Sequence, residues 1–196
     1  MKRLWHGALL GILISLAVPV IVIASGVINF AATVKPSNTE AAFAKFAVGR
    51  SMAWRVSNQA NPHQGDELAI SAGFHHYADT CLPCHGAPGV PPKEFAKGLN
   101  PAAPKLSDSL NKLSDAQIFW IIKNGIRMTG MPALGPTHSD ADIWKIVAFV
   151  RYLPGLTDEE KSELRSALGS GHQHDQPHET GEADPHDSHD HDSHEH

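Results

Sequence analysis

The chain contains only two cysteines, Cys81 and Cys84, and a histidine, His85, follows the second one directly. Covalent attachment of haem c needs two thiols at this spacing to add to the porphyrin vinyl groups, and an adjacent imidazole to ligate the iron. A thioredoxin-type dithiol would lie in a βαβ pattern, which the sequence lacks. A structural zinc site would need a second Cys or His pair, and a simple disulfide would give His85 no role. The motif therefore predicts one covalently held haem.

A second motif, Gly130-Met131-Pro132, lies downstream. A thioether is a soft, neutral ligand that suits haem iron and raises its potential when it is paired with histidine. Met128 is close enough to compete, but we expect it to line the pocket. Together the two motifs resemble those of class I c-type cytochromes, and the resemblance covers residues 66–154.

The resemblance implies an all-α fold, a small class I cytochrome c domain wrapped around one haem c, with His85 and Met131 as the axial ligands. An iron with both axial positions filled has no vacant site for a substrate, so we expect an electron carrier and not an enzyme. Its partners would be redox proteins, and we expect no nucleic-acid partner.

Helical periodicity and capping residues predict three core helices. The first runs from Asp66, its cap, to Thr80; the second spans Asp115–Asn124 after Ser114; the third runs from Ser139 or Asp140 to about Leu153. The residues expected on their buried sides are Leu68, Ala72, Gly73, Tyr77, Ile118, Ile121, Ile122, Ile143, Val147 and Val150. The resemblance implies that the first and third helices cross closely, with Phe149 against Gly73 and Tyr77.

Residues 86–113 are rich in Pro and Gly, which predicts a loop around the haem. Pro104 resembles the family's loop proline, whose carbonyl accepts the second ring N–H of the ligand histidine; Pro101 is the alternative. His75 and His76 are adjacent, so on a helix they cannot both face one iron, and we expect both to be solvated or partly buried.

The N-terminus predicts a membrane anchor over residues 1–32. Leu9 to Phe30 is almost wholly apolar and longer than the ~20 residues that span a bilayer. Lys2 and Arg3 should stay cytoplasmic, which puts the haem domain on the outer, periplasmic face of a bacterial inner membrane. The alternative is a cleaved signal peptide, for which Val22-Ile23-Ala24 is an acceptable small-residue site.

Residues 33–65 form a predicted stalk, with a helix capped by Thr39 and running through Val56. Phe43, Phe46, Ala47 and Trp54 fall loosely on one stripe. That stripe would lie on the membrane or a partner, or it would pack against the haem domain. Both alternatives are open from sequence.

Beyond the domain, residues 155–169 predict a short charged helix capped by Thr157, an appendage with a solvated face. Residues 170–196 have almost no apolar side chains and should be disordered. Removing the eight acidic residues of this tail from the net charge of −5 leaves the body at about +3, which selects no class of partner.

The tail holds eight of the fourteen histidines. Histidine clusters bind divalent Cu, Ni, Zn or Co, so the alternative function is metal homeostasis with the haem as an accessory; adventitious affinity explains the composition equally well. The candidate ligands are His172, His174, His178, His186, His189, His191, His194 and His196.

Overall fold

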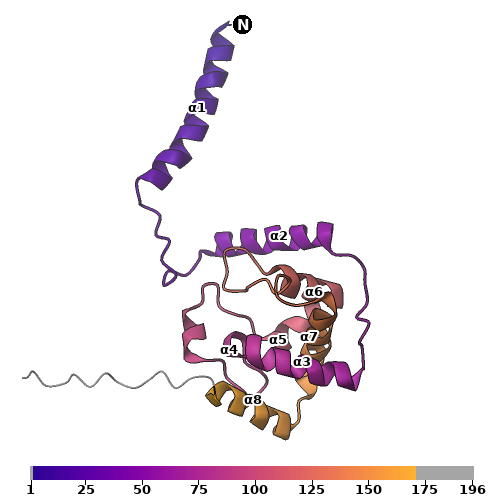
Figure 1. Ribbon diagram of the computed structural model, residues 1–196. Coiled ribbons are helices and arrows are strands. Elements are labelled where there is room, and N and C mark those ends of the chain that lie inside the picture. Colours follow the sequence, from indigo (N-terminus) through magenta and orange to yellow (C-terminus); the bar gives the residue numbers. More distant parts are fainter. Residues whose placement is uncertain (1, 171–196) are drawn as a thin grey trace, which may run out of the picture.

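The computed structural model describes residues 2–170 and shows an all-α chain (Figure 1), which confirms the predicted fold class. Within that range the only β feature is an isolated bridge between Ala87 and Val90. The helices are α1 Lys2–Ala24, α2 Asn38–Arg55, α3 Glu67–Thr80, α4 Leu82–His85, η1 Glu94–Gly98, α5 Leu106–Ser109, η2 Leu110–Lys112, α6 Asp115–Asn124, α7 Asp140–Tyr152, η3 Leu153–Gly155 and α8 Asp158–Ser170. The tail histidines, His172 to His196, lie outside the described residues.

The crossing of α3 and α7 organises the core. A Cβ atom built on Gly73 would lie 2.2 Å from the carbonyl oxygen of Lys145 and 2.8 Å from Cβ of Phe149, so only glycine permits this approach. The ring of Phe149 packs against that of Tyr77 with centroids 5.2 Å apart, and both side chains are fully buried. The predicted crossing is confirmed.

The buried face of α3 consists of Ala69, Gly73, Phe74 and Tyr77, so it shares only Gly73 and Tyr77 with the predicted set. Leu68 is 84% exposed, whereas Phe74, which was not predicted, is buried edge-on against Phe149 with centroids 5.4 Å apart. Leu68 lies in the first turn, directly after the capping Asp66, whose carboxylate accepts the N–H groups of Leu68 and Ala69. With about 3.6 residues per turn, Leu68 points away from the side of α3 that carries Ala69, Gly73 and Tyr77, all of which are buried.

Helices α6 and α7 begin at predicted caps. Ser114 and Gln117 form a reciprocal capping box, and Gly125, with φ of 64°, ends α6 in a conformation that favours glycine. Ser139, and not Asp140, caps α7 by accepting the N–H of Asp142. Hydrogen bonds from Ser139 and then Lys145 lower the pKa of Asp142 to about 2.

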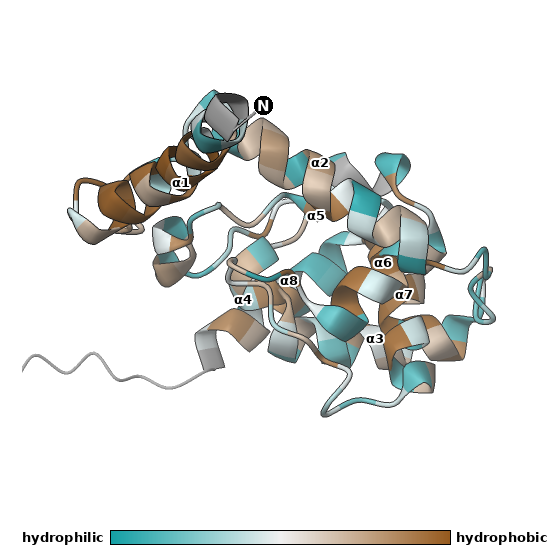
Figure 2. Ribbon diagram, turned by 90° about the horizontal axis from the view of Figure 1, so that it is seen from above, coloured by the Kyte–Doolittle hydropathy of each residue, from teal (hydrophilic) through white to brown (hydrophobic). Residues whose placement is uncertain are grey.

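Helix α1 projects from the domain and is apolar over most of its length (Figures 1 and 2). Trp5–Ala24 is long and apolar enough to cross a membrane, the one such helix among the described residues, and a signal sequence would meet the same criteria. The helix ends at Ala24, short of the predicted apolar limit at Phe30. Gly26 has φ of 69°, which no continuing helix can contain.

Helix α2 begins two residues earlier than predicted. Ser37, and not Thr39, is its cap, because Ser37 and Glu40 stand at the S-x-x-E spacing and form a complete capping box. The aromatic stripe does not pack against the domain: Phe43, Phe46 and Trp54 are all largely exposed. The only buried side chain of α2 is Met52.

Helix α8 is capped by Thr157 as predicted, with the hydroxyl accepting the N–H of Glu160. It is more than an appendage, because Leu164 is fully buried in the core and Leu168 packs against it. On the N-terminal side of α3, Asn61 is buried, and its amide donates to the carbonyl of Trp144 over 3.3 Å. Packing therefore extends beyond the three predicted core helices on both sides.

Candidate functional site

The Cys81–His85 segment follows α3 without a break. Cys81 ends α3, and Leu82–His85 form the single turn α4. Leu82 is fully buried, which anchors the turn, and the hydroxyl of Tyr77 donates to the carbonyl of Gly86 over 2.5 Å. A side chain at Gly86 would lie 2.6 Å from the carbonyl oxygen of Val90 and is excluded. The two thiols and the imidazole are thus presented by rigid backbone.

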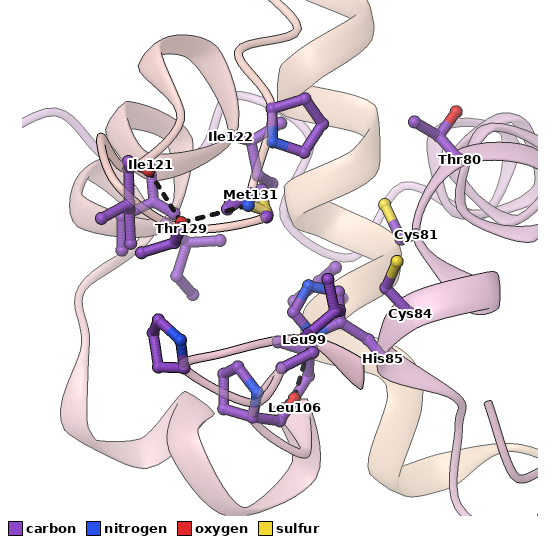
Figure 3. Close-up of a pocket in the computed structure, with 18 of the residues that line it drawn as sticks. Thr80, Cys81, Cys84, His85, Leu99, Leu106, Ile121, Ile122, Thr129 and Met131 are labelled. Carbon is purple, nitrogen blue, oxygen red and sulfur yellow. Dashed lines mark hydrogen bonds between the residues drawn. The ribbon is translucent and has the colours of Figure 1, made fainter. Parts of the chain in front are cut away.

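These groups border one cavity of about 230 Å³ (Figure 3). The two thiols lie on one side of it and Met131 on the other. Between them the walls are aliphatic, as a porphyrin face requires. The lining residues that carry aliphatic side chains include Leu99, Leu106, Leu113, Ile118, Ile121, Ile122, Ile126, Leu134 and Val150.

The imidazole of His85 is held by the Pro104 loop. Its Nδ1 lies 2.9 Å from the carbonyl oxygen of Pro104. Since a carbonyl can only accept, Nδ1 carries the proton and Nε2 is the nitrogen with a lone pair. Such a bond fixes the ring orientation and strengthens the imidazole as a donor to a metal. Pro101 also lines the cavity, but no hydrogen bond joins its carbonyl to His85.

The two methionines take opposite positions. Met131 is half-buried and faces the cavity, whereas Met128 is 88% exposed and is absent from the lining. The prediction that Met128 lines the pocket is therefore wrong. Met128 has φ of 62°, in the left-handed region, and this turn directs its side chain outward.

The Met131 loop is closed by a threonine that sequence reasoning missed. The hydroxyl of Thr129 donates to the carbonyl of Ile126 over 2.7 Å and accepts the N–H of Met131 over 3.1 Å. The N–H of Ile126 donates to the carbonyl of Met131, which completes the loop. Only the ST-turn tendency of a threonine two residues before Met131 signals this role in the sequence.

The environment of the two thiols does not suit a redox dithiol. Cys81 and Cys84 are not joined by a disulfide. Burial, and then the neighbouring Cys84, raise the pKa of Cys81 to about 12. A nucleophilic thiol of the thioredoxin type requires a lowered pKa, so this environment does not suit that chemistry.

The remaining polar candidates lie away from the cavity. His75 is exposed; His76 is half-buried and contacts the ring of His138, with centroids 5.3 Å apart. Neither lines the cavity, as predicted. Residues 2–170 contain no group of three or more His, Cys, Asp or Glu side chains placed to hold a metal ion.

Comparison with known proteins gives one family. The protein-family model described as "Cytochrome C oxidase, cbb3-type, subunit III" matches residues 68–150, from α3 to within α7. This match supports a class I c-type cytochrome domain over residues 68–150. No curated protein matches the chain. The cytochrome c domain implies a covalently bound haem c and a role in electron transfer, and together with the apolar α1 it supports a membrane-anchored protein.

The residues present fit a haem. Two unpaired thiols, an imidazole with Nδ1 already bonded and a thioether border the same aliphatic cavity. The thiol and thioether sulfurs and a neutral imidazole are the donors that haem attachment and low-spin ligation use. The helical fold and the chemistry of the cavity therefore both agree with a cytochrome c domain.

Proposed function

We propose that this protein is a membrane-tethered, mono-haem electron carrier. Cys81 and Cys84 would hold the haem through thioethers, and His85 and Met131 would ligate its iron. The observation that carries the proposal is that all four side chains border one aliphatic cavity. Haem, when bound, supplies a one-electron couple between ferric and ferrous iron.

The chain's own residues have three tasks in this function. The Pro104 carbonyl holds the His85 proton at Nδ1, which keeps Nε2 available as a donor. The Thr129 hydroxyl fixes the loop from which Met131 reaches the cavity. The aliphatic walls exclude water from the cavity. Apolar groups around the iron rearrange little when it gains or loses one electron. With His85 and Met131 both bound to the iron, no side chain would need to bind a substrate or move a proton.

The proposed location is the outer face of a bacterial inner membrane, with α1 as an uncleaved anchor. Lys2 and Arg3 precede the apolar stretch, and no further charged residue occurs until Lys35. An excess of positive charge at one end of a spanning helix keeps that end cytoplasmic. Haem attachment to exported protein, which the family resemblance implies, agrees with this direction.

We propose a membrane-bound oxidoreductase as the redox partner. The matched family is described as subunit III of a cbb3-type cytochrome c oxidase. This chain would serve such a complex as a subunit or as its electron donor.

The ligand assignment is tested by paired substitutions. Met131→Ala should lower the reduction potential and allow the reduced protein to bind carbon monoxide, because a thioether raises the potential and closes the sixth position. Met128→Ala should do neither, since that side chain is 88% exposed. Tight carbon monoxide binding by the reduced wild-type protein would show an open sixth position and overturn the carrier proposal.

A further inference from the structure

Helix α2 presents aromatic side chains to solvent. Phe43, Phe46 and Trp54 are 73%, 66% and 80% exposed. With about 3.6 residues per turn, these positions share the face opposite Met52, the buried side chain of the helix. Helices of soluble domains bury their aromatic side, so an exposed aromatic face points to a surface that covers it.

The apolar surface continues from α2 back to α1. The connector between the two helices exposes Val27, Phe30 and Val34, and the side chains of α1 from Trp5 onward are exposed as well. No charged residue interrupts the sequence from Trp5 to Val34. One occupant in contact with α1, the connector and α2 would cover all of these side chains.

The charges of α2 suit a lipid headgroup layer. Its basic residues are Lys45, Arg50 and Arg55, and its only acidic residue is Glu40 in the first turn. Arg50 lies on the aromatic face and is exposed. An arginine there can lay its aliphatic stem along the aromatic rings and extend its guanidinium to lipid phosphates. Aromatic and basic residues together are typical of segments at the membrane–water interface.

The arrangement of the helices agrees with this direction. Helix α2 crosses the side of the domain from which α1 projects (Figure 1), so a bilayer that contains α1 lies on that side. The side chain of Asn100 donates to the carbonyls of Ala32 and Val34 over 2.9 and 2.6 Å, which ties the connector to the loop beside Leu99. Leu99 lines the cavity.

We propose that α2 is an interfacial helix that lies on the bilayer with its aromatic face in the headgroup–acyl boundary. It holds the domain in one orientation, with the Leu99 side of the cavity turned towards the membrane. This proposal rests on the proposed anchoring by α1. An interfacial helix of this kind buries its apolar face by about 5–10 Å.

The test uses the full chain in nanodiscs of phosphatidylcholine and phosphatidylglycerol. Ala47→Cys carries a spin label on the aromatic face without removing an aromatic side chain, and Glu163→Cys on α8 is the exposed control. In the holoprotein the motif thiols are consumed by haem, so only the introduced cysteine reacts. The collision rate of the spin label with oxygen is high in lipid, where oxygen concentrates. Its collision rate with a polar nickel chelate is high in water.

The label at position 47 should collide more with oxygen and less with the nickel chelate than the label at position 163. Collision with the nickel chelate equal to that at position 163 overturns the proposal, because α2 then lies in water. Protection from both reagents also overturns it and indicates that a protein surface, such as a second copy, covers the helix.

A second set of variants separates the aromatic face from general apolar exposure. Phe43→Ser, Phe46→Ser and Trp54→Ser combined should return the label at position 47 to water-like collision rates. Phe95→Ser, at an exposed phenylalanine of η1 that is not part of α2, should leave the rates unchanged. Resistance of the wild-type chain to alkaline extraction tests α1 independently. An extractable chain would contradict the anchor, whereas unchanged rates in the triple variant contradict the interfacial helix alone.

Discussion

Gly73→Ala should destabilise the domain strongly, because the α3–α7 crossing has no room for a methyl group. The added Cβ would lie 2.2 Å from the carbonyl oxygen and 2.8 Å from the carbonyl carbon of Lys145, and 2.8 Å from Cβ of Phe149. Two of these atoms are helix backbone and the third is a Cβ, so the helices must separate. Overpacking costs about 1–3 kcal/mol, and alanine returns up to about 1 kcal/mol of helix propensity. Because the closest contact is with the backbone of the facing helix, the upper end of this cost applies, and we expect a net loss of about 2 kcal/mol.

Thermal unfolding of the holoprotein, followed by circular dichroism, measures this loss. For a domain of this size about 1 kcal/mol shifts Tm by about 4–8 °C, so we expect a decrease of about 8–16 °C. Gly98→Ala is the control, since a Cβ there meets nothing within 4 Å. If Gly73→Ala unfolded at the temperature of the control, the close crossing would be refuted.

Three further substitutions test other parts of the account. Thr129→Val keeps the shape of the side chain but removes both hydrogen bonds of the hydroxyl. We expect a lower reduction potential in a potentiometric titration and partial binding of carbon monoxide to the reduced protein. An unchanged potential would show that Thr129 does not position Met131. Hydrogen bonds lower the pKa of Asp142 to about 2, so its contribution to the free energy of unfolding is present above about pH 4 and is lost as the pH falls through 2. In denaturant titrations, the free energy of unfolding of Asp142→Asn should therefore decrease less steeply at acid pH than that of the wild type. An equal decrease in both proteins would contradict the hydrogen-bonded carboxylate. Leu164→Ala should cost about 2–3 kcal/mol in the same titrations because the side chain is fully buried, whereas exposed Leu68→Ala should cost almost nothing; equal effects would place α8 outside the cooperative core.

Local chemistry made several features predictable. Capping by Asp66, Ser114 and Thr157 depends on side chains that bond their own backbone within three residues, so the sequence is sufficient. The contact of Gly73 with Phe149 was predicted only through the family resemblance, because no local rule specifies which helices cross.

Features that depend on tertiary context were missed. Met128 and Met131 are three residues apart and chemically identical, and their opposite exposure follows from a left-handed backbone conformation at Met128 that composition does not reveal. Leu68 is four residues before Ala72 and fits the predicted i, i+4 pattern, but the side of α3 that meets the facing helix carries Phe74 instead. The packing of Leu164 likewise depends on where α8 returns to the domain.

The error at α2 had a local signal. Ser37 and Glu40 form a capping box whose S-x-x-E spacing is visible in the sequence, and this spacing identifies Ser37, not Thr39, as the cap. The stripe itself could not be assigned a partner from sequence, since a face that packs on a domain and a face that lies on a membrane have the same periodicity. The exposure of Phe43 and Trp54 decides against packing on the domain.

The central claim is that one covalently held haem makes this chain a one-electron carrier. The most direct test is a spectroelectrochemical titration of the purified full chain, combined with its mass under denaturing conditions. We predict a mass increased by one haem and a single reversible wave that fits one electron per chain. A chain that loses its haem on denaturation, or that titrates as a two-electron dithiol at Cys81 and Cys84, would contradict the account.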